Sequence, residues 1–415
     1  MNYEFRSVRT KKSNVQYSGN RFERIESKDQ ITQTVRVLFD GKLSTAIGSK
    51  PDSFEELKKQ AADMVEYGSE HSTPFVGKTT VKPMNLVDES VLTSKEMIDI
   101  LGGYVADLRA LDKQLIVSAE LSSITNEINL KTGEGFDHGY RQTNWSIGCY
   151  VELMQGEDLL TLYDEEMLIG PHFNVKKHVD TISKKLGYAK NVVPFEPGAY
   201  PVIFTPGQVG HIVTPVVASL SGMAVYRQMS RWGDKLGQEM LDPAFTLVDD
   251  GTIDGVWTSK PFDNEGTPTK RNILVQNGVL GDLLTDRKTA ALLNRESSGN
   301  AATGFMPVAP HSLRLSPGNK SLDELIKSID YGMIIDSTMG AWSGNPYAGV
   351  VSGTISMGLK VEKGKVVGRV KDCMFTINAF DHFRKHLAGF SSEIKPAQNN
   401  VFPYVMLDEV VISTK

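Results

Sequence analysis

A proline-rich connection near the middle of this 415-residue chain separates two parts with different patterns. Residues 189–201 read AKNVVPFEPGAYP, and a segment with three prolines neither continues a helix nor pairs well inside a sheet. Long alternating segments and amphipathic helices precede it, whereas 23 of the 37 glycines lie from Gly198 onward. The sequence therefore predicts an α+β fold with two domains, a mixed helix and antiparallel-sheet domain over 1–190 and a β-rich domain over 197–415.

Local signals predict the elements of each part. In the first part, capping-box patterns begin at Ser53 and Thr93 and predict two helices, and a third helix is expected near Val175–Leu186. Strands and hairpins are expected at Ile31–Ala46 around Asp40-Gly41, at Gln114–Lys131, at Asn144–Met154, around Asn277-Gly278, around Lys363-Gly364 and at Tyr404–Ser413. A third capping box at Ser321 predicts a short helix in the second part.

Composition and charge exclude several classes of protein. Lys plus Arg is 45 and Asp plus Glu is 50, and this net charge of −5 argues against a nucleic-acid-binding surface. The longest apolar stretch, Gly210–Tyr226, is interrupted by polar residues and is shorter than the ~20 residues of a membrane span. The two cysteines, Cys149 and Cys373, cannot form a disulfide framework. With no secretory signal at the N-terminus, we expect a cytoplasmic protein that binds neither membrane nor nucleic acid.

Few residues form a pattern that is typical of catalysis. His382 and His386 stand four residues apart, as a zinc pair on a helix requires, but no glutamate lies between them and no third ligand is indicated. Because Arg384 and Lys385 would repel a cation, we interpret this segment as a solvated helix face. No Gly-x-Ser-x-Gly elbow occurs, and Gly77-Lys78-Thr79 lacks the earlier glycine of a phosphate loop.

One stretch is rich in carboxylates, and it leaves two interpretations open. Its members are Asp249, Asp250, Asp254, Asp263 and Glu265. Paired acids can bind a metal or divide the roles of acid and base. Acids beside glycine and proline are more often turn formers, and this is the interpretation that we favour from the pattern alone.

An ordered run of motifs through the second part resembles the C-terminal domain of the TldD/PmbA family, also called TldD/TldE. The run includes Gly233-Asp-Lys-Leu-Gly237, Asp249-Asp-Gly-Thr252, Glu265-Gly-Thr-Pro-Thr269, Asn277-Gly278, Ser298-Gly-Asn-Ala301 and Leu315-Ser-Pro-Gly318. The connection Pro197-Gly-Ala-Tyr-Pro201 resembles the family's entry to this domain, and Val35–Gly41 shows weaker similarity in the first part.

The resemblance implies a peptidase, but not one with a complete metal site. The TldD branch resembles a zinc metallopeptidase with His-Glu-x-x-x-His on a helix and a late cysteine. Carried over to this sequence, the helix lies at Gly210–Ala224, the ligand positions fall on Thr214 and Ser219, and the glutamate position falls on Pro215. Hydroxyls are poor zinc ligands and proline cannot act as a base. We expect Thr214 to cap this helix with Pro215 in its first turn.

The resulting prediction is a PmbA/TldE-like subunit that has no catalytic residues and no cofactor, with zinc expected only in a TldD-type partner. It would pair with that partner, or with itself, and help to process peptides or unfolded proteins. Substrate contact is predicted at Asp263, Glu265 and Thr267 and along strand edges near Ser343–Ser356. Two alternatives stay open: a non-enzymatic protein-binding regulator, following the family's label as modulator of DNA gyrase, and a hydrolase that uses His382 and His386.

Overall fold

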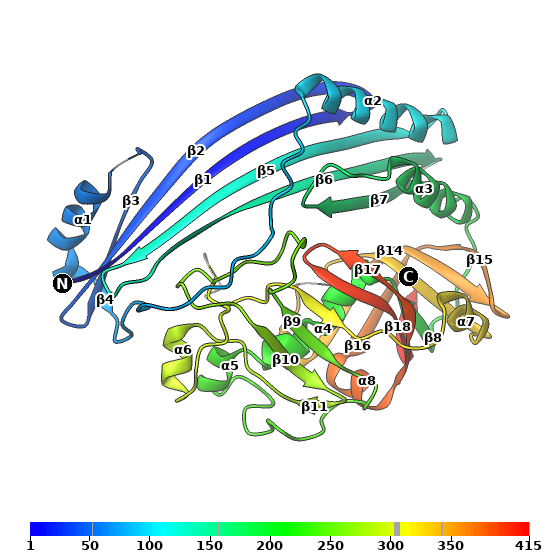
Figure 1. The fold of residues 1–415 in the computed structure, drawn as a ribbon. Helices are drawn as coiled ribbons and strands as arrows, with labels where there is room; N and C mark the ends of the chain where they lie inside the picture. Colours follow the sequence, from blue (N-terminus) through cyan, green and yellow to red (C-terminus); the bar gives the residue numbers. More distant parts are fainter. Residues whose placement is uncertain (52, 157, 303–307, 342, 415) are drawn as a thin grey trace.

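The long alternating segments of the first part form one antiparallel sheet. In the computed structural model, which describes residues 1–51, 53–156, 158–302, 308–341 and 343–414, this sheet has seven strands in the order β4-β3-β2-β1-β5-β6-β7. The strands are β1 (Asn2–Ser18), β2 (Arg21–Phe39), β3 (Lys42–Gly48), β4 (Ser69–Glu70), β5 (Ile116–Thr132), β6 (Asp137–Gln155) and β7 (Asp158–Leu168). The long strands curve over the C-terminal half of the molecule (Figure 1).

Helices cover one face of this sheet. They are α1 (Phe54–Asp63), the short 3-10 helix η1 (Val65–Tyr67), α2 (Ser94–Leu111) and α3 (Val175–Ala189). Side chains of β6 alternate between the two faces, so that Ile147, Val151 and Leu153 pack against α2 and α3 while their neighbours point to the other face. Figure 1 shows α2 on the outer side of the arch.

The helix starts were predicted with mixed success. The capping boxes at Thr93 and Ser321 are confirmed. In each, the N-cap hydroxyl accepts a hydrogen bond from the backbone N–H of the glutamate three residues later, and the side chain of that glutamate accepts one from the N-cap backbone N–H. The box at Ser53 is wrong. The Ser53 hydroxyl instead donates to Gln33 Oε1 (2.7 Å) and to the carbonyl of Lys50 (3.0 Å), because the side chain of Gln33 in β2 lies within its reach.

The glycine-punctuated second part forms an eleven-stranded sheet in the described residues. Its strands are β8 (Gly198–Phe204), β9 (Leu247–Asp250), β10 (Arg271–Gln276), β11 (Val279–Leu280), β12 (Leu313–Leu315), β13 (Tyr331–Met339), β14 (Val350–Glu362), β15 (Lys365–Val370), β16 (Cys373–Asn378), β17 (Leu387–Ala397) and β18 (Asn400–Thr414). Its helices are α4 (Pro206–Ser219), α5 (Gly222–Tyr226), α6 (Arg287–Leu292), α7 (Leu322–Lys327), η2 (Pro346–Ala348) and α8 (Ala379–Lys385). Both hairpins predicted at Asn277-Gly278 and Lys363-Gly364 are present.

Part of this second sheet closes on itself. β8 pairs with β13 on one side and with β18 on the other, and β14 and β16 complete the ring. A closed ring leaves no free strand edge along its circumference. The mixture of helices and mostly antiparallel strands confirms the α+β class. None of the helices in the described part of the chain is both long enough and apolar enough to span a membrane.

Two large apolar clusters hold the molecule together. One surrounds α4 inside the second part and includes Val213, Val216 and Phe402. The other joins the helices α2 and α3 to the outside of the ring, where Ile334 and Tyr404 belong to it. The predicted division at 190 and 197 stays a prediction, although the two sheets lie on either side of it in sequence.

Candidate functional site

Helix α4 carries the positions at which the resemblance places a metal site. The helix begins earlier than predicted, since Thr205 is the N-cap and Pro206 is the first helical residue. The prediction that Thr214 caps this helix is therefore wrong, because Pro206 already takes the first-turn position that suits proline. Pro215 lies inside the helix and cannot donate the usual hydrogen bond to the carbonyl of His211.

The three metal-site positions do not converge on one point. Thr214 is exposed, and its hydroxyl donates to the carbonyl of Gly210 at 2.8 Å. Ser219 is fully buried, and within the described part of the chain its hydroxyl oxygen has no hydrogen-bond partner. Five helical residues turn the chain by about 140° beyond a full turn, so the two side chains leave α4 in different directions. Pro215 is buried and offers no ligand atom.

The residues around α4 do not fit a zinc ion. Within the part of the chain that the structure describes, no group of three or more His, Cys, Asp or Glu side chains is arranged to hold a metal. Cys373 is buried, and burial raises the pKa of its thiol to about 11. Its Sγ donates to the carbonyl of Lys371 at 3.1 Å, so it offers no thiolate to a metal at neutral pH.

The histidine pair near the C-terminus also lacks the geometry of a metal site. The ring centroids of His382 and His386 are 5.4 Å apart. The ring nitrogens of His382 lie 2.9 Å from the carbonyl oxygen of Asn378 and 3.3 Å from that of Glu409. The interpretation of a solvated face is wrong for His382, which is buried between α8 and β18 and serves to connect them.

The acidic stretch divides into buried and exposed members. Asp249 is fully buried at the end of β9, and its carboxylate accepts hydrogen bonds from the backbone N–H groups of His311 (2.7 Å) and Ser312 (2.9 Å) and from the side chain of Asn300 (2.7 Å). Asp254 is exposed and accepts from the backbone N–H of Asn85. These acids therefore hold loops in place, as turn and loop formers do.

Asp263 organises the loop in which the three predicted substrate contacts lie. It is almost fully buried, and its carboxylate accepts from the backbone N–H groups of Glu265 (2.9 Å), Thr267 (3.0 Å) and Ala301 (2.9 Å). Burial raises the pKa of Asp263 to about 6 in spite of these bonds. Thr267 has a buried hydroxyl, which has no hydrogen-bond partner among the residues that the structure describes. The loop thus brings Asp263, Glu265 and Thr267 together, with Asp263 already occupied by backbone donors.

Glu265 lies where the two halves of the molecule meet. Its carboxylate accepts from the backbone N–H of Arg287 at 2.9 Å, and it lines a cavity of about 10 Å³ together with Glu4, Arg36 and His71. This volume is that of about one water molecule, so the cavity is too small for a peptide side chain. Burial, followed by the nearby Asp263 and Asp286 carboxylates, raises the pKa of Glu265 to about 7.

The strand edges near Ser343–Ser356 are partly covered by neighbouring strands. β14 pairs with β13 on one side and with β15 and β16 on the other. On the β13 side the pairing covers Thr354–Glu362, so peptide contact along the part of this strand before Thr354 stays a prediction.

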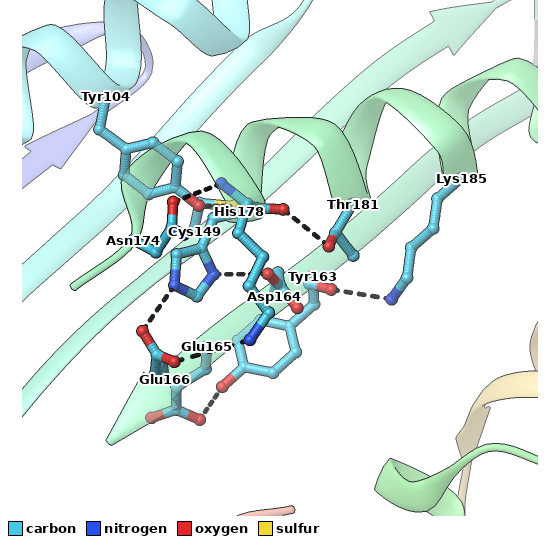
Figure 2. Close-up of polar contacts among 11 residues, drawn as sticks. Tyr104, Cys149, Tyr163, Asp164, Glu165, Glu166, Asn174, His178, Thr181 and Lys185 are labelled. Carbon is cyan, nitrogen blue, oxygen red and sulfur yellow. Dashed lines mark hydrogen bonds and ion pairs between the residues drawn. The ribbon is translucent and has the colours of Figure 1, made fainter. Parts of the chain in front are cut away.

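One polar cluster had no sequence signal that pointed to it. Figure 2 shows His178 of α3 between two carboxylates of β7. His178 Nδ1 lies 2.6 Å from Asp164 Oδ2, and Nε2 lies 3.2 Å from Glu166 Oε2. Burial opposes charge on this ring, but the bonds and charges of the two acids outweigh it and raise the pKa of His178. Both ring nitrogens are engaged by carboxylates, so the ring has no lone pair for base catalysis. Its positive charge attracts the two acids of β7 and so holds α3 against that strand, and we call this contact the His178 clamp.

Comparison with a family model supports one assignment for the second part of the chain. Residues 197–414 match the model described as PmbA/TldA metallopeptidase C-terminal domain.

Individual relatives agree with this match. The chain is 26% identical over 357 residues to the metalloprotease TldD homolog of Buchnera aphidicola, covering 77% of this chain and 70% of that protein. The crystal structure of TldE from Thermococcus kodakarensis superposes with a TM-score of 0.91 at 22% identity, over 99% of this chain and 96% of that one. A Thermotoga maritima protein described as a candidate modulator of a DNA gyrase gives 0.91 at 21% identity, over the same shares. At such identity the solved structures show that the fold is shared.

Proposed function

Because the chain belongs to the family of PmbA/TldD metallopeptidases, we propose that it is a PmbA- or TldE-like subunit without a catalytic metal of its own. It would assemble with a TldD-type subunit, and the pair would process peptides or unfolded proteins. The zinc ion would belong to the TldD-type subunit. The buried, free thiols of Cys149 and Cys373 accord with a cytoplasmic location for this work.

The observation that carries the proposal is the geometry of α4. A catalytic zinc site needs about three protein ligands that converge on one point and an open position for water. Thr214 points to solvent, Ser219 points into the core, and Pro215 lies between them without an ionisable group. No hydrolytic step through a metal can be derived from these three residues.

A complex is supported by the kinds of relative that the family contains. Proteins named as TldD homologues and as PmbA homologues both match this chain, as does the fold of a TldE. Two kinds of chain with one shared fold can form a dimer in which only one kind supplies the metal. A dimer of two copies of this chain would then have no zinc hydrolase activity.

The decisive experiment measures zinc content and peptide cleavage together. The purified chain is expected to contain well under one zinc per chain and to cleave no unfolded protein. Mixing it with a TldD-type subunit from the same genome, one with an intact His-Glu-x-x-x-His helix, is expected to give cleavage that a chelator stops. A stoichiometric, histidine-bound zinc in the pure chain would overturn the proposal.

We also propose Glu265 and Thr267, positioned by Asp263, as substrate contacts that require the partner to be bound. The alternative role of the Asp263 loop is to join the two halves of the chain. Glu265→Gln and Thr267→Val keep the size of each side chain. Reduced partner-dependent cleavage without any loss of melting temperature is expected for each variant, and unchanged cleavage would contradict substrate contact.

A second candidate function is that of a protein-binding regulator. The observation behind it is the similarity in fold to the Thermotoga protein described as a candidate gyrase modulator. Capture of partners on the immobilised chain separates the two functions. Recovery of gyrase without a TldD-type subunit favours the regulator, and recovery of a TldD-type subunit favours the peptidase complex.

A further inference from the structure

A pocket of about 270 Å³ lies among the start of β10, the segment that follows β11 and the segment that follows α6. We call it the α6 pocket. Its lining divides by burial into a buried floor of Asn272, Leu283, Thr285 and Ser298 and an exposed rim of Lys270, Asp282, Arg295 and Glu296. The floor is neutral and all four rim residues are charged, so the pocket has the character of a small-molecule site with a few polar groups in its wall.

The floor holds a buried hydrogen-bond acceptor that the fold leaves unused. Asn272 is only 1% exposed. Its Nδ2 donates to the carbonyl of Ser298 (3.2 Å) and to Asn300 Oδ1 (3.0 Å), whereas its Oδ1 has no hydrogen-bond partner in the described residues. A buried polar atom without a partner costs stability, and an N–H group of a bound molecule would remove that cost. The floor therefore favours a molecule with an N–H donor.

The rim offers charges of both signs to a bound molecule. Lys270 and Arg295 are cations, and Asp282 and Glu296 are anions. In the part of the chain that the structure describes, none of the four forms an ion pair with another side chain. Such a set favours a molecule that carries one carboxylate and one ammonium group, because each then meets two opposite charges. A lone phosphate or metal ion would face two like charges instead.

The volume of the pocket limits the size of this molecule. A cavity of about 150 Å³ holds a benzene ring, and the same ratio gives about ten non-hydrogen atoms for the α6 pocket. A nucleotide has more than twice that number, whereas a dipeptide of small residues has about eleven. A dipeptide also places a peptide N–H between its ammonium and its carboxylate. It is thus the class of molecule that fits the size, the rim and the floor together.

We propose that the α6 pocket binds a short, zwitterionic peptide of about two small residues. Lys270 and Arg295 bind its carboxylate. Asp282 and Glu296 bind its ammonium group, and Asn272 Oδ1 accepts a hydrogen bond from its peptide N–H. This inference rests on the proposed function, because the processing of peptides releases fragments of this kind.

The α6 pocket adjoins the proposed substrate contacts at Glu265 and Thr267. Lys270 of the rim follows Thr267 by three positions in the chain. Thr285 of the floor precedes by two positions Arg287, whose backbone N–H donates to Glu265 at 2.9 Å. Three residues of extended chain span about 10 Å. A fragment released near these two contacts therefore has only a short way to the pocket.

The first test titrates the purified chain, without any partner, with three small probes of nearly equal size in a calorimeter. Alanylalanine is expected to bind saturably with one site per chain. Alanylsarcosine is its isomer without the peptide N–H, and we expect its Kd to be at least tenfold weaker because Asn272 Oδ1 then stays unpaired. N-acetylalanine N-methylamide has no charged ends and is expected to show no saturable binding. Equal binding of the three probes would overturn the proposal.

The second test changes the rim. Lys270→Gln with Arg295→Gln removes the cations for the carboxylate, and both side chains are exposed, so the melting temperature should stay unchanged. We expect at least a tenfold weaker Kd for alanylalanine. The matched control, Arg109→Gln with Lys113→Gln, removes two exposed cations in the N-terminal half and should change the Kd by less than about twofold.

The outcomes separate this inference from the proposed function. If alanylalanine does not bind to the wild-type chain, or binds equally to the Lys270 and Arg295 variant, the peptide site is overturned. Zinc-dependent cleavage with a TldD-type subunit, measured separately, would then still support the proposed function. Absence of that cleavage together with selective binding of alanylalanine would overturn the proposed function and leave the pocket as a dipeptide site.

Discussion

At the scale of single residues, the imidazole of His178 joins α3 to β7 through the carboxylates of Asp164 and Glu166. Replacing it by glutamine leaves Asp164 and Glu166 without their shared cation. We expect His178→Gln to lower the free energy of unfolding by about 3 kcal/mol at pH 6, as removal of one member of a buried ion pair does. The matched control is Asp180→Asn, which changes an exposed charge on the same helix.

The pH dependence of this effect has a definite sign. The folded-state pKa of His178 is raised, so its contribution to stability is complete below the pKa of the unfolded chain and is lost as the pH rises through the folded pKa. The difference between wild type and His178→Gln in urea unfolding should therefore be larger at pH 6 than at pH 9. An equal difference at both values would rule out the clamp.

Asp249 belongs to the acidic stretch that could have indicated catalysis, but its carboxylate has a structural role. Asp249→Ala leaves two backbone N–H groups and the Asn300 amide without their acceptor in the core. We expect a loss of about 3 kcal/mol in the free energy of unfolding, measured by chemical denaturation. Asp99→Ala, on the exposed side of α2, is the control and should change stability by less than about 0.5 kcal/mol.

At the scale of elements, two hairpin turns with the same backbone differ in what surrounds them. Asp40-Gly41 and Asn277-Gly278 have positive φ at both residues, of 49° and 71° in the first turn and 49° and 78° in the second. A Cβ on Gly41 would meet no atom within 4 Å, whereas a Cβ on Gly278 would lie 2.3 Å from the carbonyl oxygen of Leu241.

This difference predicts unequal effects of the same substitution. Gly41→Ala should cost about 1 kcal/mol of unfolding free energy, from the left-handed backbone alone. Gly278→Ala should cost at least about 3 kcal/mol, because the Leu241 backbone must also move. Thermal unfolding of the two variants, side by side, provides the measurement. Equal losses of unfolding free energy in the two variants would show that the Leu241 backbone moves away from the new Cβ at no energetic cost.

These turns also show which parts of the fold could be predicted from the sequence. Asn-Gly and Asp-Gly act locally, so both hairpins were predicted correctly, as was the cap at Thr93. The closure of β8 onto β18 joins residues about 200 positions apart, and no local pattern records it. The start of α4 was misplaced because Pro206 and Pro215 both suit the first turn of a helix. The sequence pattern does not distinguish between them, and in the fold the helix begins at Pro206. For the candidate site, the sequence shows that Thr214 and Ser219 offer only hydroxyl groups, and their assignment to the metal positions stays a prediction. The contacts of Asp263 and His178 depend on residues far apart in the sequence and could not be predicted from it.

At the scale of the whole molecule, Glu265 links stability to the contact between the two halves. It belongs to the C-terminal half and lines the small cavity against Arg36 of β2 and His71. Because burial raises its pKa to about 7 from an ordinary 4.5, the folded chain binds a proton that the unfolded chain releases at neutral pH. Ionisation of Glu265 therefore costs stability, fully above pH 7 and not at all below about pH 4.5.

Replacing this carboxylate by an amide should remove that cost. Glu265→Gln keeps an oxygen that can accept from the Arg287 N–H, so we expect it to raise the free energy of unfolding by about 2–3 kcal/mol at pH 8 and by close to zero at pH 4.5. Chemical denaturation at the two pH values is the measurement, with the exposed Glu23→Gln as the control. A gain that is equal at both pH values would mean that the amide packs better for reasons unrelated to charge. A loss at pH 8 would mean that the ionised carboxylate, held by Arg36, stabilises the contact between the two halves.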